Sequence, residues 1–534
     1  MSGTSVISGL SSGIDWRDIL DQLKAVEYKR VELLQDRRKT YEDRLSAWQA
    51  INTKLLAFKT AAGTLNTTSR FNLYTTSLTS DTATAAEDIL SATTSTDAGR
   101  GTYQIRVNTR ATAQKLSSTT YASQTTSLDL SGELIVGGRT VSIAATDTLI
   151  GIRDKLNAAN TGTDPSDVTA SIIKYGDADY RLTLTSDEEG EEGFSLANGE
   201  GSTLVETMGF AEIQTGANAS ITVDGEDIFP SSNTVDDMIT GVTLNLKQAA
   251  PATTVTLTVS RDDAKVKETI SNYVTAYNDV MNAINDQMTY NSENNTTGGA
   301  LFGDSTLRAI KKSLTELVIN RVSGVDQDFS TLGLIGIKLG NDSNLSIDDE
   351  ELQENLENNF EDVKKLFAAD WSATNSNVTY GYHTTDTKAG TYAINITGVS
   401  PVAGYFVTPG DATGNGEFLT GVSGDAKGLM IRYSGTATGA VGTFTLTYGV
   451  AELMDRALFH VTDSVDGILS NKTETIQDQI GNMDESIQRL EDQIDQKMAR
   501  MEQQFIAMET ALSTLQSQSS WLTSQLNSVA NGWW

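Results

Sequence analysis

The chain of 534 residues contains no cysteine and only two histidines, His383 and His460. The absence of cysteine excludes disulfide bonds, thiolate metal sites and cysteine nucleophiles. Two histidines that lie far apart in the sequence are also a poor ligand set for zinc. We therefore expect a protein with no metal site and no cofactor.

Basic residues are scarce, since 39 lysines and arginines stand against 70 acidic residues and the net charge is −31. This charge argues against nucleic acid or an anionic membrane as the main partner. No apolar run is long enough to cross a bilayer, and the N-terminus lacks the basic and apolar regions of a cleaved signal peptide. We therefore expect no membrane insertion, and a cytoplasmic protein unless an uncleaved terminus directs export.

The stretch "ISGLSSGIDW" at residues 7–16 contains the GxSxG pattern of a serine hydrolase, with Ser11 at its centre. That pattern requires a buried strand before the serine and a histidine as general base. Only eight residues precede Gly9, and neither histidine lies in a recognisable acid–base setting. Asp15 instead stands where the N-cap of a following helix belongs. We predict that the chain is not an enzyme, and a hydrolase built on Ser11 is the weakest alternative.

Long segments show helical periodicity. Residues 16–65 contain no proline and place apolar residues three and four positions apart, which predicts one long helix or two in series. Three further helical segments are residues 266–284, 307–318 and 352–367. Asp304 and Asp348 stand at N-cap positions, and Glu351 follows Asp348 at capping-box spacing.

Two other segments read as β-structure. Residues 75–262 are rich in threonine and alternate apolar and polar residues, as in "YRLTLTS", which predicts strands in two lobes. They include an Asp-Gly hairpin in "ITVDGEDIF" and a short helix near "TLIGIRDKLNAAN". Residues 371–449 return to this pattern, and their phrases "GTYAINI" and "GTFTLTY" echo "GTYQIRV" at residues 101–107. Either related β-modules or ordinary strand chemistry would produce such phrases.

The most regular pattern lies in residues 476–529. Apolar residues there alternate steps of four and three, which is the seam of a coiled coil. The first part of the seam consists of Ile476, Ile480, Met483, Ile487, Leu490 and Ile494. After a phase shift of four residues, the seam continues from Met498 to Val529. A seam of this length requires partner helices.

Charge indicates which helices pair. Residues 15–60 carry ten basic and eight acidic residues, whereas residues 471–510 carry four basic and nine acidic ones. Opposite signs favour pairing of the first helix with the last. Residues 1–14 and 511–534 contain no charged residue but several large apolar ones, so we interpret both ends as assembly segments that become ordered on binding.

Several segments resemble a known family when they are taken together and in order. They are "ISGLSSGIDWRDILDQL", "GTYQIRV" followed by "ATAQKLSS", "GIRDKLNAAN", "YRLTLTS", "ITVDGEDIFPSSNTVDDMITGVTLNLK", "VKETISNYVTAYNDVMNAI", "GALFGDSTLRAIKKSL" and "QFIAMETALSTLQSQSSWLTSQL". In this order they resemble the bacterial flagellar filament cap proteins, also called flagellar hook-associated protein 2. Residues 371–449 interrupt the order of shorter members and resemble an additional β-module.

The pattern and the resemblance together imply an α+β multidomain fold. The N- and C-terminal helices pair as a coiled-coil stalk or leg, next to a helical body and β-rich head domains. The expected divisions are a leg of 1–40 and 490–534, a helical body of 41–74, 265–370 and 450–489, a β-rich head of 75–264, and a β-module insertion of 371–449.

The resemblance also implies a function. Such a protein is exported through the flagellar type III apparatus and forms a ring, a pentamer in the family, at the distal tip of the flagellum. There it promotes folding and insertion of flagellin. Other implied partners are an export chaperone and the hook–filament junction proteins.

The resemblance implies two sets of functional residues in this chain, one in the leg and one in the coiled-coil seam. The leg residues in contact with flagellin would be Ile7, Leu10, Ile14, Leu23, Val26, Phe505, Met508, Leu512, Leu515, Trp521 and Leu526. The coiled-coil seam would be Ile480, Met483, Ile487, Leu490 and Ile494. Trp533 and Trp534 lie beyond the matched motif. The alternative function is a surface adhesin, whose β-modules would bind host glycan or matrix on a coiled-coil stalk.

Overall fold

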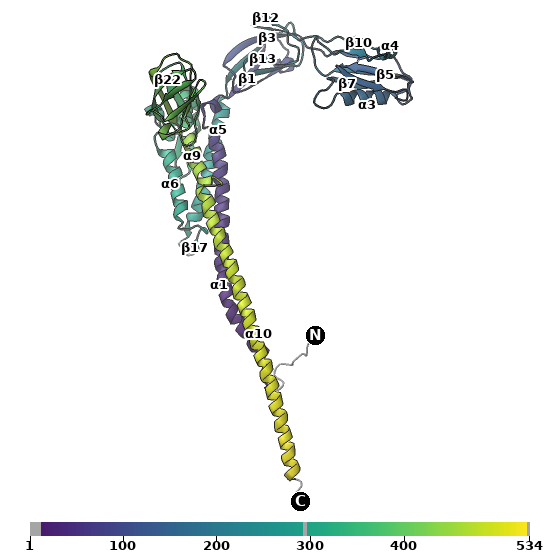
Figure 1. Ribbon diagram of the computed structural model, residues 1–534. Coiled ribbons are helices and arrows are strands. Elements are labelled where there is room, and N and C mark those ends of the chain that lie inside the picture. Colours follow the sequence, from purple (N-terminus) through teal and green to yellow (C-terminus); the bar gives the residue numbers. More distant parts are fainter. Residues whose placement is uncertain (1–11, 292–295, 531–534) are drawn as a thin grey trace. The chain divides into compact units, whose positions relative to one another are not determined.

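The computed structural model describes residues 12–291 and 296–530 (Figure 1). The chain divides into two compact units, which are considered separately. Unit 1 is Met1–Thr68 with Lys267–Trp534, and unit 2 is Ser69–Val266. Unit 2 is therefore an insertion into unit 1. None of the described helices is both long and apolar enough to span a membrane.

Unit 1 is built on long helices. They are α1 (Trp16–Gly63), α5 (Asp263–Met288), α6 (Ser305–Ile319), α7 (Asp349–Asn358), α8 (Phe360–Phe367), α9 (Val450–Thr462) and α10 (Ile468–Ala530). The segment predicted as one helix or two is the single helix α1. The predicted caps are confirmed, because Asp15 accepts from the backbone N–H of Asp18, Asp304 from that of Thr306, and Asp348 from that of Glu351.

The core of the helical part of unit 1 is aromatic. Phe58 of α1 lies 5.2 Å from Tyr273 and 5.6 Å from Tyr277 of α5, measured between ring centroids. Phe367 of α8 packs edge-on against Tyr273 at 5.9 Å. Short hairpins complete this part: β16 (Tyr290–Asn291) with β17 (Thr296–Thr297), and β18 (Ile337–Leu339) with β19 (Leu345–Ile347).

The Tyr273 hydroxyl is buried without a hydrogen-bond partner among the described residues, and burial raises its pKa. An unpaired buried hydroxyl costs about 1 kcal/mol or more. We expect Tyr273→Phe to raise the melting temperature of the chain. The matched control is Tyr448→Phe, because the Tyr448 hydroxyl donates to the carbonyl of Thr387 at 2.9 Å. That substitution should lower the melting temperature, and equal effects of both would contradict the argument.

A β-module lies in unit 1 between α8 and α9. Its strands are β20 (Ala369–Ala373), β21 (Val378–Tyr382), β22 (Gly390–Val399), β23 (Val402–Tyr405), β24 (Ala412–Asn415), β25 (Phe418–Gly421), β26 (Met430–Tyr433) and β27 (Gly439–Tyr448). They form two four-stranded sheets around one core, in the orders β20-β27-β22-β23 and β21-β26-β25-β24. The echoing phrases "GTYAINI" and "GTFTLTY" are the paired strands β22 and β27 of one sheet, so they do not mark separate modules.

Buried polar side chains connect this module to α9. Glu452, only 5% exposed, accepts hydrogen bonds from His383 Nε2 at 3.1 Å and Arg456 Nε at 2.6 Å. The Tyr380 hydroxyl lies 2.7 Å from the other ring nitrogen of His383. Arg456 also donates to the carbonyl of Thr387 and covers the ring of Tyr448 at 4.0 Å. His383 therefore has a defined acid–base setting, which the sequence interpretation denied.

Burial alone would raise the pKa of Glu452, but His383 and Arg456 more than offset it and hold the pKa of the carboxyl below its ordinary value. The resulting stabilisation is complete above about pH 4.3, the ordinary value, and is lost as the pH falls through the lower folded value. Because Glu452→Gln leaves Arg456 without its charge partner, we expect a loss of about 3 kcal/mol at pH 7. The wild type should also lose more stability than this variant between pH 5 and pH 3.

Thermal unfolding followed by circular dichroism at several pH values measures both effects. The matched control is Glu417→Gln on the same module, since Glu417 pairs with Arg432 on the surface with both side chains about half exposed. Exposed pairs contribute roughly 0–1 kcal/mol. A Glu452 variant no less stable than the Glu417 variant would contradict the buried linkage.

Unit 2 contains two hydrophobic cores. Its strands are β1 (Tyr74–Ser80), β2 (Leu90–Thr94), β3 (Gly101–Thr109), β4 (Lys115–Ser117), β5 (Gly132–Val136), β6 (Arg139–Ile143), β7 (Val168–Gly176), β8 (Asp179–Ser186), β9 (Leu196–Asn198), β10 (Ala211–Gln214), β11 (Ser220–Val223), β12 (Glu226–Ile228), β13 (Thr234–Ile239), β14 (Val242–Leu246) and β15 (Val255–Arg261). Its helices are α2 (Ala86–Ile89), α3 (Leu149–Ala159) and α4 (Leu204–Met208).

The first core of unit 2 lies within the sheets β1-β15-β3-β11-β12 and β13-β14-β2, and the second within β10-β4-β8-β7, β6-β5-β9 and the helices α3 and α4. The predicted Asp-Gly hairpin is confirmed. It joins β11 and β12, and both Asp224 and Gly225 have the positive φ that this turn requires. The predicted short helix is α3.

Candidate functional site

The first helix α1 pairs with the part of the last helix, α10, that precedes about Phe505, and α10 continues beyond it (Figure 1). Three ion pairs join them: Lys24–Asp495 at 3.0 Å, Glu27–Lys497 at 2.7 Å and Arg38–Asp484 at 2.5 Å. From Lys24 to Arg38 the residues advance along α1, whereas their partners run back from Asp495 to Asp484 along α10, so the helices are antiparallel. The pairing predicted from opposite charge is confirmed. We call the paired region with the continuation of α10, residues 12–44 and 478–530, the stalk.

The ion pairs of the stalk are exposed to solvent. The hydrogen bond from Lys24 to Asp495 raises the pKa of the lysine, and the bond from Lys497 lowers the pKa of Glu27. Exposed pairs add little stability, so their main effect is to fix which helices pair and in what register.

The structure places the predicted seam residues of α10 on the side facing α1. Ile494 is buried, and Ile480, Met483, Ile487 and Leu490 are half-buried.

Their counterparts on α1 were missed by sequence reasoning. They include Trp16, Leu20 and Val31, which are all at most 9% exposed. The pattern was hidden because Lys24 and Glu27 occupy the seam positions between them and form the ion pairs. With Lys24 and Glu27 included, the positions from Leu20 to Val31 follow at steps of four, three and four residues, and this spacing was the signal that could have located the seam.

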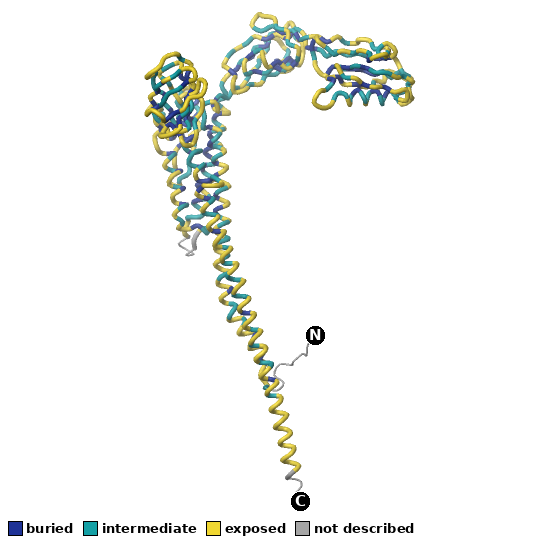
Figure 2. The backbone as a smooth tube through the Cα atoms, viewed as in Figure 1, coloured by how far each residue is buried: buried dark blue, intermediate teal, exposed yellow. Residues whose placement is uncertain are grey.

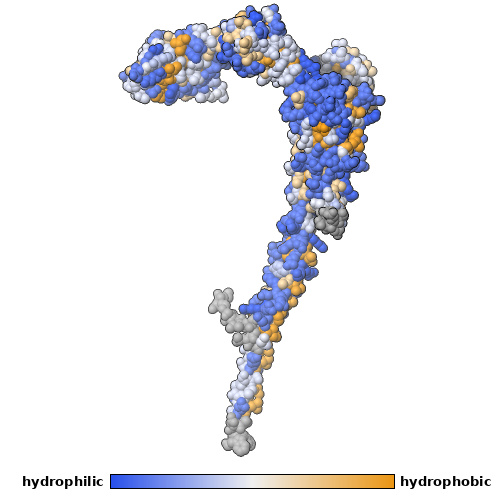
Figure 3. All heavy atoms as spheres, turned by 180° about the vertical axis from the view of Figure 1, so that it is seen from behind, coloured by the Kyte–Doolittle hydropathy of each residue, from blue (hydrophilic) through white to orange (hydrophobic). Residues whose placement is uncertain are grey.

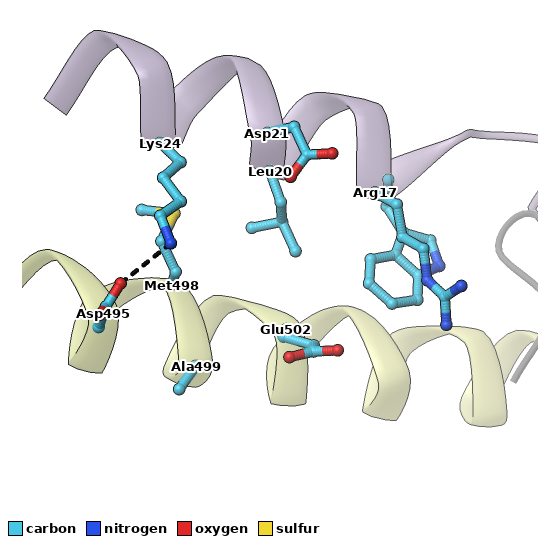
Figure 4. Close-up of a pocket in the computed structure, with 9 residues that line it drawn as sticks. Arg17, Leu20, Asp21, Lys24, Asp495, Met498, Ala499 and Glu502 are labelled. Carbon is cyan, nitrogen blue, oxygen red and sulfur yellow. Dashed lines mark ion pairs between the residues drawn. The ribbon is translucent and has the colours of Figure 1, made fainter. Parts of the chain in front are cut away.

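Trp16, the first residue of α1, lies at the end of the paired region. Its ring stacks on Phe505 with 5.8 Å between centroids and 8° between planes. Next to it lies a groove of about 470 Å³ between the helices (Figure 4). Leu20, Met498 and Ala499 form its apolar part, and the Lys24–Asp495 pair crosses one end. The residues that line the groove include no serine, threonine or histidine.

Beyond Phe505, α10 continues to Ala530 past the start of α1, and Ser12 donates a hydrogen bond to Glu509 in this stretch. Its apolar side chains are largely uncovered (Figure 2): Leu515 is 59% exposed, Trp521 63%, Leu522 55% and Leu526 63%. Met508 lies at the start of this segment and is 36% exposed, while Leu512 is half-buried. Since residues 511–534 carry no charge, the exposed leucines and Trp521 make this end of the helix an exposed apolar surface.

The other predicted leg residues lie on or near α1. Leu23 and Val26 point away from the α10 seam and are 37% and 66% exposed, and Ile14, just before the helix, is also exposed. Figure 3 shows hydrophobic residues along one edge of the stalk, continuing toward the end of α10. Ile7, Leu10, Ser11, Trp533 and Trp534 lie outside the described residues.

Within the described part of the chain, no group of three or more histidine, aspartate and glutamate side chains is placed to hold a metal ion. The fold and the site define a class: a multidomain α+β protein that pairs its terminal helices, inserts β-domains between them in the sequence, and exposes an apolar helix end.

Comparison with known proteins identifies the family. The family models of the flagellar hook-associated protein 2 N-terminus and C-terminus match residues 12–114 and 216–517. The B-type flagellar hook-associated protein 2 of Pseudomonas aeruginosa is 31% identical over 396 residues, covering 68% of this chain and 81% of that protein. The protein of that name from Escherichia coli O157:H7 is 30% identical over 403 residues, covering 71% and 83%. The chain belongs to the flagellar hook-associated protein 2 family.

A solved structure supports the same assignment. The D1-D2-D3 domains of the flagellar cap protein of Escherichia coli superpose with a TM-score of 0.53 and 26% identity, covering 81% of this chain and 99% of that one. The segment between the two family matches, residues 115–215, contains almost all of the second core of unit 2. These relationships give no support to the adhesin interpretation.

Proposed function

We propose that the chain caps the distal end of a bacterial flagellar filament, where it forms a homo-oligomeric ring and promotes the folding and insertion of exported flagellin. The observation that carries this proposal is the exposed, uncharged apolar end of α10. Such a surface is suited to contact with apolar helices of another subunit, and the family relationship supports flagellin as that subunit.

In this proposal the leg comprises residues 1–40 and 490–534. Residues 41–74, 265–370 and 450–489 form the helical body, and residues 75–264 and 371–449 form β-rich parts of the plate above the growing end. The leg contacts are Ile7, Leu10, Ile14, Leu23, Val26, Phe505, Met508, Leu512, Leu515, Trp521 and Leu526. Each leg can bind the filament end weakly, because several legs together hold the ring in place. Insertion sites for flagellin can therefore open one after another without loss of the cap.

The proposal includes further partners. Before export through the flagellar type III apparatus, a chaperone would cover the apolar end of α10, which would otherwise promote aggregation. The hook–filament junction proteins would form the base on which the first ring assembles, and the ring would be a pentamer.

Deletion of the gene in its own bacterium tests the proposal. The mutant should release flagellin monomers into the medium and carry no filaments, and the full chain supplied from a plasmid should restore them. Electron microscopy and immunoblotting of the medium measure both. Filaments of normal length in the mutant would overturn the proposed function.

A further inference from the structure

The upper part of the stalk carries a row of arginines on the outside of α1. Arg30, Arg37 and Arg44 are spaced seven residues apart, so they lie on one side of the helix. All three are exposed, and none forms an ion pair among the described residues. Arg44 packs over the ring of Tyr41 at 5.4 Å. We call this row the basic face.

A matching row of carboxylates lies on α10. Asp478, Glu485 and Asp492 also follow at intervals of seven residues and are exposed. None is ion-paired within the described part of the chain, although Asp492 accepts a hydrogen bond from the Gln488 amide at 3.2 Å. We call this row the acidic face.

The two faces lie at the same level along the stalk. The register follows from Trp16 on Phe505 and Arg38 with Asp484, and the long ion pairs Lys24–Asp495 and Glu27–Lys497 depart from it by two or three residues in opposite directions. Continued through the paired region, this register places Arg30 level with Asp492, Arg37 with Glu485 and Arg44 with Asp478. The three arginines are therefore matched one to one in height by three carboxylates.

Within one chain these residues cannot meet, because the faces lie on opposite sides of the helix pair. Arg30 lines a groove on one side of the seam, together with Gln493 and Arg500. The groove on the other side is lined by Asp495 and Ala499, and Ala499 lies seven residues after Asp492, which puts the two on nearly the same side of α10. The complementarity is thus directed outward, toward another molecule.

We propose that the basic face of one copy binds the acidic face of the next copy, at the same level along the two stalks. The contact joins two different faces, so each copy uses both and the contact repeats from copy to copy. Because the faces are level, the repeat needs no shift along the stalk, and a series of copies closes into a ring instead of climbing as a filament. This inference rests on the proposed ring and assigns its contact to the upper stalk.

A glycine provides a second observation. Gly481 lies between Asp478 and Glu485 on the acidic face, in the interior of α10, where glycine weakens a helix relative to alanine. Nothing lies within 4 Å of the position that its Cβ would occupy. Thr40, between Arg37 and Arg44 on the basic face, is at the matching level. The missing side chain lets the neighbouring helix approach closely, since the distance between packed helices is set by the side chains at the contact.

Disulfide cross-linking tests the contact directly, because the chain contains no cysteine. The variant carries Arg37→Cys together with Glu485→Cys, which are placed to meet only between copies. Under mild oxidation it should give a ladder of covalent oligomers that ends at the ring. The two single-cysteine variants are the controls, and neither should produce more than dimers.

Charge reversal tests the energetics on the full chain. Arg30→Glu with Arg37→Glu should lower the association constant by about a hundredfold or more, since like charges then face each other across the contact. Adding Glu485→Lys and Asp492→Lys should restore it. The matched control is Lys29→Glu with Lys39→Glu, which makes the same charge change on the same exposed helix outside the basic face. Light scattering over a range of concentrations gives the mass of each variant.

The outcomes separate this inference from the proposed function. A wild type that forms an oligomer with no cross-linked ladder, or with an unchanged mass after reversal, overturns the stalk contact and leaves the ring in place. A wild type that is monomeric at every concentration overturns both the contact and the ring.

Discussion

Replacing Leu515, Leu522 and Leu526 with aspartate is expected to abolish filament growth without changing the thermal unfolding of the chain. All three side chains are more than half exposed, so the fold does not depend on them. If flagellin covers them, each leucine contributes about 2 kcal/mol of buried apolar surface. The loss of all three weakens each leg by about 6 kcal/mol, which is roughly a 10⁴-fold change in affinity.

Filament length in cells that carry the variant measures this effect, and circular dichroism checks the fold. The matched control replaces three exposed serines on the opposite side of the same helix segment, Ser513, Ser517 and Ser524, with aspartate. The control adds the same charge to the same segment and should leave filaments nearly intact. If both triple variants lost filaments equally, added charge and not the apolar surface would be responsible.

The second large effect is expected for Trp16→Ala. The indole is 1% exposed and stacks on Phe505 where the paired helices end, so its removal leaves a cavity at that point. Truncation of a buried tryptophan costs about 4 kcal/mol. Because α1 begins at Trp16, the loss should appear as unwinding of its first turns, with an earlier and broader thermal transition.

Hydrogen exchange read by mass spectrometry locates this unwinding, and residues 16–31 should lose protection while the core around Phe58 keeps it. Trp521→Ala is the matched control, because that tryptophan lies in the same stalk but is 63% exposed. Equal losses of stability in the two variants would show that the stacked ring does not hold the end of α1.

The sequence predicted well those features that depend on local chemistry or on net charge. The caps at Asp15, Asp304 and Asp348 follow from a side chain and the backbone N–H groups two or three residues later. The pairing of α1 with α10 follows from opposite net charge and a long heptad seam, which need no knowledge of the rest of the fold. The family resemblance added the overall order of helical and β-rich segments.

Other features could not be predicted because they depend on which strands and helices meet. His383 and Glu452 are 69 positions apart and come together only because β21 lies beside the start of α9. The α1 seam was hidden for a different reason. Lys24 and Glu27 stand where apolar residues were sought, and their role depends on charges more than 450 positions later in the chain.

The pairing of the two chain ends also determines when the stalk can fold during synthesis. Ser12 and Glu509, which share a hydrogen bond, are 497 positions apart. At about 5–20 residues per second of synthesis, the start of α1 waits roughly 25–100 s before its partner exists. The stalk is therefore the last element of the molecule that can form. A chain that entered an export channel as soon as its synthesis ended would travel without a stalk to unfold.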